Sequence, residues 1–248
     1  MTAAAPQPPL TPVAGVHEGL ARDGHVVVGA QSLATLCGVR LADLLAWQPR
    51  WDDLPSDRYL RDGGHYRQRR HSCFVVKPDG VAAVPHRPHW QSLDYNALHG
   101  GIERHFEPMS AAWTREATWL QLLRGLAGCA SRLRGAQDWY VEAHPFRITT
   151  AGGIGRPTPE GAHRDGVDFV AVILVSRAGI KGGETRVFDA AGPHGLRFTL
   201  DEPFSALLLD DARVIHESTP IQPLDPAREG HRDTLVLTYR AGGFQGAA

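Results

Sequence analysis

The chain has 248 residues, of which 42% are hydrophobic, and its formal net charge is −1 at pH 7. This length and composition predict one sizeable hydrophobic core, in a single domain that we expect to span residues 15–248. The small net charge argues against a nucleic-acid or acidic-membrane partner recognised by bulk electrostatics.

Residues 1–14 lack the features of a secretion signal, because they are rich in Ala and Pro without a basic start or an apolar segment. We expect them to form a disordered leader. The longest strongly apolar run, residues 169–175, is too short to span a bilayer. Three scattered cysteines, Cys37, Cys73 and Cys129, indicate neither a disulfide framework nor a structural zinc site. We therefore predict a cytoplasmic protein without a membrane partner.

The region 15–136 is predicted to be mainly helical. Ser32 is a suitable N-cap for a helix whose apolar residues recur at approximately helical spacing as far as Leu45. A second and more strongly periodic helix is predicted between residues 114 and 133. We expect this region to support the core and to cover the substrate.

The region 137–240 changes to short strands separated by Gly, Pro and Asp. Eight short strands in a row are typical of a jelly roll or a barrel, in an α+β chain with a mainly β core. The helices would then pack on the outside of one sheet. A hairpin is also expected earlier, with strands at 73–76 and 81–84. The eight strands are expected near residues 139–143, 146–150, 167–175, 184–188, 196–200, 205–209, 214–219 and 234–239.

A His-x-Asp pair, His163 and Asp165, lies between two glycines. On an extended strand the side chains at i and i+2 point the same way, so these two would converge on one point. His216 can complete the group from another strand. Two His and one carboxylate hold Fe(II) on one face and leave three positions open, as non-haem Fe(II) oxygenases need for a co-substrate and dioxygen.

A His-x-Asp triplet is expected roughly once by chance, so its context decides its meaning. The chain contains a second one, His231-Arg232-Asp233, which no later His follows. The first is followed by an apolar run, a Gly-Gly turn and then His216, so we take the first as the metal-binding pair. The alternative is a solvated loop pair and an unrelated buried His.

A co-substrate with a distal carboxylate needs a fixed cation, and a guanidinium can bind both oxygens in a planar fork. Arg232 is the candidate, with Thr234 on the same strand face as a hydroxyl donor. The alternative for Arg232 is a surface salt bridge. Arg147 is either a second carboxylate-binding residue or a paired structural arginine.

Other charged residues carry weaker predictions. The basic stretch 58–71 is interrupted by acidic residues and is read as a solvated face or a small anion site. A zwitterionic substrate would require a charged pair, for which Arg147 with Glu160 or Asp168 is a candidate. Five histidines without a partner pattern are read as surface or hydrogen-bonded structural residues: His65, His86, His89, His99 and His105.

In order along the chain, His163-x-Asp165, the glycine turn, His216 and Arg232-x-Thr234 resemble the Fe(II)/2-oxoglutarate-dependent dioxygenases. The text around His163 is similar to the bacterial branch with L-isoleucine dioxygenase, other free L-amino-acid hydroxylases and a biofilm- and stress-associated relative. The resemblance is best over residues 139–239.

This resemblance implies a double-stranded β-helix, a cupin-like jelly roll, in residues 137–240. It also implies that His163, Asp165 and His216 bind Fe(II), and that Arg232 anchors 2-oxoglutarate, with O2 as the second co-substrate. The expected reaction is hydroxylation of an unactivated C–H bond in a small molecule, which in this branch is a free L-amino acid.

Two rival functions remain open. A cupin-like metal enzyme of another reaction class would share the barrel, but it usually has more histidine ligands. A non-catalytic or sensing metal-binding module in a biofilm or stress pathway would keep the fold without turnover. Strict dependence on 2-oxoglutarate separates a dioxygenase from both.

Overall fold

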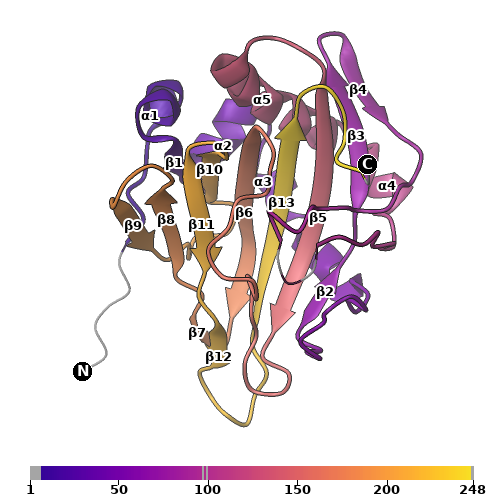
Figure 1. Ribbon diagram of the computed structural model, residues 1–248, viewed down its shortest axis with the longest axis vertical. Helices are drawn as coiled ribbons and strands as arrows, with labels where there is room; N and C mark the ends of the chain where they lie inside the picture. The colour runs from indigo at the N-terminus through magenta and orange to yellow at the C-terminus, as the bar shows by residue number, and fades with distance from the viewer. Residues whose placement is uncertain (1–6, 97, 99, 247–248) are drawn as a thin grey trace.

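Strands from both halves of the chain form one large antiparallel sheet. The computed structural model describes residues 7–96, 98 and 100–246. Figure 1 shows its central strands side by side. In spatial order, the strands are β1 (His25–Val28), β10 (Ala206–Asp210), β6 (Phe169–Ala178), β13 (His231–Arg240), β5 (Trp139–Thr149), β3 (Ser72–Lys77) and β4 (Gly80–Ala83), and β2 (Arg67–Arg69) also pairs with β5.

Two smaller antiparallel sheets complete the β structure. One contains β11 (Val214–Ser218), β8 (Thr185–Asp189) and β9 (Gly195–Phe198), in that order. The other pairs β12 (Ile221–Pro223) with β7 (Ile180–Gly182). This mainly antiparallel architecture with few helices confirms the predicted jelly-roll class of fold.

The two faces of the large sheet have different environments, because side chains alternate along its central strands. On β13, Leu235 and Leu237 belong to the main hydrophobic cluster, whereas Thr234 and Thr238 line a pocket on the other face. The same alternation on β5 places Val141 in the core and its polar neighbours in the pocket. One strand pair therefore builds both the core and the pocket wall.

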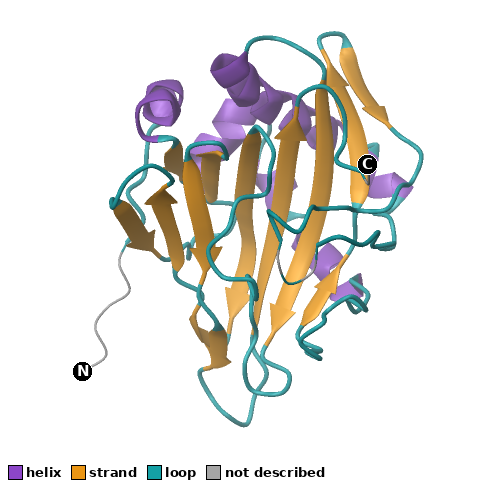
Figure 2. Cartoon of the chain, viewed as in Figure 1, coloured by secondary structure: helices purple, strands orange, loops and turns teal. Residues whose placement is uncertain are grey.

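The helices cover the apolar face of this sheet, as expected. Figure 2 shows most of them at one end of the strands and behind them. Trp119, Leu122 and Leu126 of the longest helix belong to the same buried cluster as the core residues of β5 and β13. The helices are η1 (Val13–Gly15), α1 (Val16–Asp23), α2 (Ala30–Cys37), α3 (Leu41–Leu45), η2 (Gln48–Asp53), α4 (Ala111–Thr114) and α5 (Ala117–Arg134).

One of the two predicted helices is divided, and the other is confirmed. Gly38 adopts a φ of 65° and ends α2, so the helix expected from Ser32 to Leu45 is α2 and α3. The N-cap of α2 is Gly29, and the assignment of Ser32 as the cap was wrong. Left-handed backbone is a common helix stop, and glycine adopts it without strain. The later helix, expected between residues 114 and 133, is confirmed as α5, and the short α4 lies before it.

The strand predictions differ from the structure mainly at β5 and β1. The two strands expected on either side of Pro145 are one continuous strand, β5. Pro145 lies where the neighbour of β5 changes from β3 to β2, so its missing N–H interrupts neither pairing. The hairpin of β3 and β4 is confirmed, whereas β1 at the sheet edge was not predicted.

The expected leader is only partly within the described residues. Residues 1–6 lie outside them, whereas Leu10 forms a parallel bridge with Val27 and η1 begins at Val13. The end of the expected leader is therefore ordered against β1. Within the part of the chain that the structure describes, no helix is long and apolar enough to cross a membrane. The single domain, 15–248, remains our interpretation.

Two glycines of α5 provide a matched test of how this helix packs. A Cβ on Gly125 would lie 2.5 Å from the Cα of Cys37 on α2, whereas a Cβ on Gly128 meets nothing within 4 Å. Gly125→Ala should lower the free energy of unfolding by about 1–3 kcal/mol through overpacking. Gly128→Ala should raise it by about 0.5–1 kcal/mol through helix propensity. Urea unfolding measures both, and equal effects would contradict this packing.

Candidate active site

The three predicted metal ligands converge in the structure. His163 and His216 exchange backbone hydrogen bonds, with N···O distances of 3.0 and 2.9 Å. Their Nε2 atoms lie 3.9 and 3.8 Å from the two carboxylate oxygens of Asp165. One ligand atom from each residue lies within 4.8 Å of the others. The imidazole of His216 therefore faces the other two donors, as the metal-site hypothesis requires.

The local structure differs from the expected strand. His163 forms a single bridge to β11, and Asp165 lies in the loop that follows it. The buried carboxylate of Asp211 accepts hydrogen bonds from the backbone N–H groups of Asp165, Gly166 and Val167, at 3.0, 2.8 and 3.0 Å. Asp211 therefore fixes the loop that presents Asp165, a role that no local pattern in the sequence indicated.

These side chains fit a divalent cation. His163 Nδ1 donates to the carbonyl oxygen of Gly161 at 2.9 Å, so in the neutral ring Nε2 is the nitrogen without a proton. No described residue forms a hydrogen bond with the ring of His216, and its Nδ1 is buried. Burial lowers the pKa of His216 to about 3, so this imidazole is neutral and able to ligate. Burial raises the pKa of Asp165, which a bound cation would offset.

Arg232 and Thr234 line the same pocket, on the face of β13 that points away from the core. Arg232 is 3% exposed, and its Nε and one terminal nitrogen have no hydrogen-bond partner among the described residues. Burial is the main cause that lowers its pKa to about 10, with Arg177 adding to the effect. A buried guanidinium without a partner is a suitable site for an anion.

Arg147 does not line this pocket. Its guanidinium binds both carboxylate oxygens of Asp233 at 2.8 Å and also contacts Asp52 at 2.8 Å. The structure thus favours the paired structural arginine over the carboxylate-binding role. The same contact explains the second His-x-Asp triplet, because Asp233 serves as the partner of Arg147. Glu160 and Asp168 were the two candidates for the acidic member of a substrate-binding pair. Glu160 lines the pocket, whereas the carboxylate of Asp168 accepts a hydrogen bond from the backbone N–H of Ala241.

Several pocket residues were not singled out from the sequence. Arg67 and Arg69 lie in the stretch read as a solvated face or a small anion site, and their exposures of 6% and 3% exclude the solvated face; both line the pocket with Arg104. His89 is buried there as well and lies at hydrogen-bond distance from Glu142, which agrees with its reading as a hydrogen-bonded structural residue, but its place in the pocket was not predicted. His99 lies outside the described residues. The alternating Arg67-x-Arg69 pattern of a strand was the one available indication.

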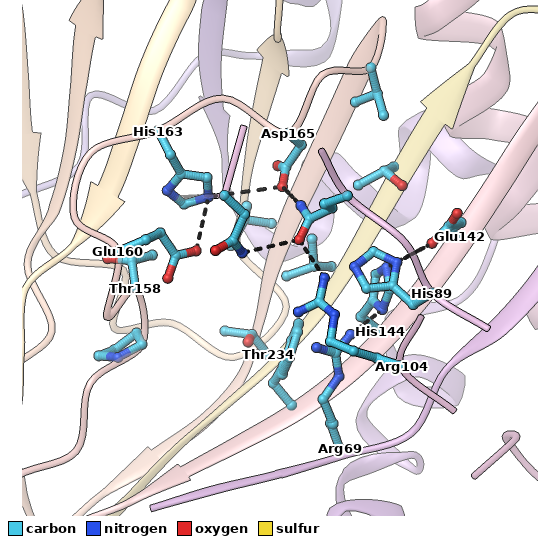
Figure 3. Close-up of a pocket in the computed structure, with 18 of the residues that line it drawn as sticks. Arg69, His89, Arg104, Glu142, His144, Thr158, Glu160, His163, Asp165 and Thr234 are labelled. Carbon is cyan, nitrogen blue, oxygen red and sulfur yellow. Dashed lines mark hydrogen bonds and ion pairs between the residues drawn. The ribbon is translucent and has the colours of Figure 1, made fainter. Parts of the chain in front are cut away.

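The pocket has charges of both signs on its walls. Figure 3 shows His163, Asp165 and Glu160 on one side of it, and Arg69, Arg104 and His144 on the other. Glu160 Oε1 lies 3.7 Å from His163 Nε2. Apolar side chains from β6 and β13 complete the wall between these groups. The arrangement can hold a small polar molecule beside the candidate metal ligands.

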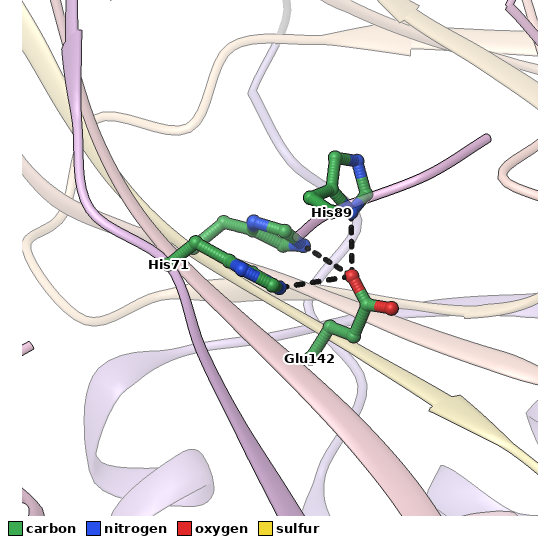
Figure 4. A group of neighbouring side chains, drawn as sticks. His71, His89 and Glu142 are labelled. Carbon is green, nitrogen blue, oxygen red and sulfur yellow. Dashed lines mark hydrogen bonds and ion pairs between the residues drawn. The ribbon is translucent and has the colours of Figure 1, made fainter. Parts of the chain in front are cut away.

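A second group of metal-ligating side chains, His71, His89, Glu142 and His144, lies in the same region and is fully buried. Figure 4 shows its rings directed at one oxygen of Glu142. His71 Nε2 and His89 Nδ1 lie 3.0 and 2.5 Å from this oxygen. These are hydrogen-bond distances, which two neutral imidazoles donating to a carboxylate explain.

The tautomer of His144 argues against metal binding by this second group. Arg69 lies 2.6 Å from His144 Nδ1, and a guanidinium can only donate. The proton of a neutral His144 is therefore on Nε2, the nitrogen that faces Glu142 at 3.7 Å. A protonated nitrogen cannot bind a metal ion. The group of His163, Asp165 and His216 is therefore the better candidate for iron.

The model of the 2OG-Fe dioxygenase family matches residues 48–238. A solved structure of a bsmA homolog from Methylobium petroleophilum PM1 is 54% identical, with a TM-score of 0.91 over 96% of this chain and 97% of its own. No curated protein sequence matches the chain.

Two more distant structures share the fold. IDO from Bacillus thuringiensis is 18% identical, with a TM-score of 0.75 over 94% of this chain and all of its own. The Fe(II)/α-ketoglutarate-dependent dioxygenase TqaL is also 18% identical, with a TM-score of 0.67 over 94% of this chain and 90% of its own. At this identity the likeness concerns the fold alone.

The buried histidines predict an acid-sensitive fold. Burial lowers the pKa of His71 and His144, and it lowers that of His89 to about 3. Below pH 6.5 the unfolded chain takes up protons that the folded chain does not, so stability falls with decreasing pH. His89 alone contributes about 1.4 kcal/mol per pH unit between pH 6 and 4, because its pKa in the folded chain lies below this window. Melting temperature against pH should fall less steeply in His89→Gln than in the exposed control His86→Gln, and identical slopes would contradict this assignment.

Proposed function

The chain belongs to the 2OG-Fe dioxygenase family, and from this premise we propose that it hydroxylates an unactivated C–H bond of a free L-amino acid, with iron held by His163, Asp165 and His216. The family uses Fe(II), 2-oxoglutarate and O2. The single observation that carries the site assignment is the convergence of these three side chains beside a buried, unpaired Arg232. Bound there, ferrous iron would supply the oxidation of the C–H bond, coupled to decarboxylation of 2-oxoglutarate to succinate.

The residues of the chain have separate tasks in this reaction. The hydrogen bond from His163 Nδ1 to Gly161 O orients one imidazole, and Asp211 holds the loop that carries Asp165. Arg232 offers its free N–H groups to the distal carboxylate of 2-oxoglutarate, and Thr234 adds a hydroxyl donor from the same strand face. These contacts orient the co-substrate, and the surrounding wall limits the access of water.

Two observations support a small amino-acid substrate. The sequence around His163 resembles the branch of free L-amino-acid hydroxylases, and the pocket places arginines opposite Glu160. A zwitterion needs both signs of charge at short range. We also place the protein in the cytoplasm, because its three cysteines are buried and free, as a reducing compartment allows.

Asp165→Ala should weaken iron binding by more than about 100-fold and abolish 2-oxoglutarate turnover, because it removes the only carboxylate of the triad. Glu142→Gln is the matched comparison, since it removes the carboxylate of the second buried group. Iron content after anaerobic loading and desalting, together with succinate formation, measures both. Loss of iron in Glu142→Gln but not in Asp165→Ala would assign the metal to the second group.

Arg232→Ala should raise the KM for 2-oxoglutarate by about 100-fold, because each charge-assisted hydrogen bond contributes about 1.5–3 kcal/mol. Arg232→Lys should recover only part of the loss, since an ammonium lacks the planar fork. Succinate formation against co-substrate concentration measures both variants. An unchanged KM in Arg232→Ala would remove this residue from the co-substrate site.

A further inference from the structure

Three buried arginines of the pocket have no carboxylate partner among the described residues. Arg67 forms an ion pair with Asp57 at 2.7 Å, but Arg69, Arg104 and Arg232 form none within 4.0 Å. Their exposed fractions are only 2–3%. A buried cation without a counter-ion is costly, so a pocket that keeps three of them is suited to anionic ligands.

Arg69 and Arg104 also retain unused donors. Arg69 contacts His144 Nδ1, and Arg104 donates to Gln91 Oε1 at 2.7 Å. The Nε atoms of both arginines are buried without a hydrogen-bond partner in the described chain. Burial lowers the pKa of Arg104 to about 10, which leaves the guanidinium charged at neutral pH.

These two arginines are separate from the proposed 2-oxoglutarate site. Arg69 on β2 pairs with Phe146 on β5, and Phe146 pairs with Thr234 on β13, so a whole strand separates Arg69 from the strand of Arg232. The Phe146 ring also packs against Arg69, with the guanidinium carbon 4.3 Å from the ring centroid. One ligand carboxylate bound by Arg232 therefore leaves Arg69 and Arg104 available for a second.

The arginine pair is close to the candidate metal ligands. Gln91 links the two groups, because its Oε1 accepts from Arg104 and its Nε2 lies 3.4 Å from Asp165 Oδ1. A carboxylate bound at Arg104 is thus one side chain away from a metal ligand. That separation suits a small molecule whose carbon chain must reach the metal.

Glu160 supplies the opposite charge across the pocket. Its side chain is 12% exposed, and its Oε2 is buried without a hydrogen-bond partner in the described residues. In Figure 3 its carboxylate faces the cavity from the side opposite Arg69 and Arg104. An ammonium group would satisfy this oxygen, since three N–H donors can reach acceptors at several angles.

We propose that Arg69 and Arg104 bind the carboxylate of the substrate and that Glu160 binds its ammonium group. This assignment rests on the proposed function and names the residues that select a zwitterion. The histidines around Glu142 then act as positioning residues, because His144 accepts from Arg69 and holds it against the pocket wall. A substrate lacking either charge would leave a buried group of the protein unpaired.

The test uses the full chain loaded with Fe(II) and 2-oxoglutarate. Succinate formation is measured with each of the twenty free L-amino acids, then with the carboxamide and the deaminated acid of each active one. The wild type should lose on the order of 100-fold in kcat/KM with either analogue. Arg104→Gln should abolish the preference for the amino acid over its carboxamide. Glu160→Gln should abolish the preference for the amino acid over its deaminated acid. Arg70→Gln is the control, because Arg70 pairs with Glu107 at the surface.

The outcomes separate this proposal from the proposed function. If an amino acid is turned over and Arg104→Gln keeps the full preference for the acid, the subsite is wrong and the function stands. If no amino acid is active, the amino-acid function fails, and propionate binding then decides the carboxylate subsite. A rise in melting temperature with propionate in the wild type but not in Arg104→Gln supports the subsite, and equal rises overturn it.

Stability of the ligand-free protein gives a readout that does not depend on turnover. Arg104→Met keeps the volume but removes the unpaired charge, so we expect the melting temperature to rise by about 2–4 °C. If Arg104 instead stabilised the fold, the melting temperature of Arg104→Met would fall. A fall of several degrees would therefore overturn the ligand-binding role of Arg104.

Discussion

The alternation of side chains on β5 and β13 is the constraint on which the rest of the structure depends. Both strands lie in the middle of the large sheet. Each contributes apolar side chains to the core under the helices and polar side chains to the pocket on the other face. A shift of one residue would move Leu235 and Leu237 into the pocket and Arg232 into the core. The register of this one pair therefore sets both the core and the position of the buried Arg232 in the pocket.

The candidate metal centre depends on this sheet only indirectly. Its three ligands come from β11 and from a loop, and backbone contacts bring them together: the paired hydrogen bonds of His163 with His216, and the three N–H groups bound by Asp211. Such contacts place the ligands without using their side chains. The imidazoles and the carboxylate remain available to a cation, which agrees with a His216 ring that is buried without a hydrogen bond in the described structure.

The pocket carries a destabilising set of charges that the fold tolerates. Unpaired guanidinium groups and an unpaired carboxylate oxygen lower the stability of the ligand-free chain, and bound ligands would restore their interactions. Elsewhere the same residue types are paired, as Arg67 is with Asp57 and Arg147 is with Asp233. The distinction between paired and unpaired buried arginines separates those that support the fold from those suited to bind a ligand.

The sequence by itself determined the class of fold and the identity of the metal-ligand candidates. Strand periodicity and the His-x-Asp spacing are local properties, and side-chain alternation follows directly from backbone geometry. The burial and the partners of Asp211, Arg69, Arg104 and Glu142 were decided only by the tertiary structure. An arginine or a histidine has the same local pattern whether it is solvated, paired or directed into a pocket, because burial and partners come from strands distant in sequence. Arg147 shows this most clearly, since only the pairing of β5 with β13 places it beside Asp233.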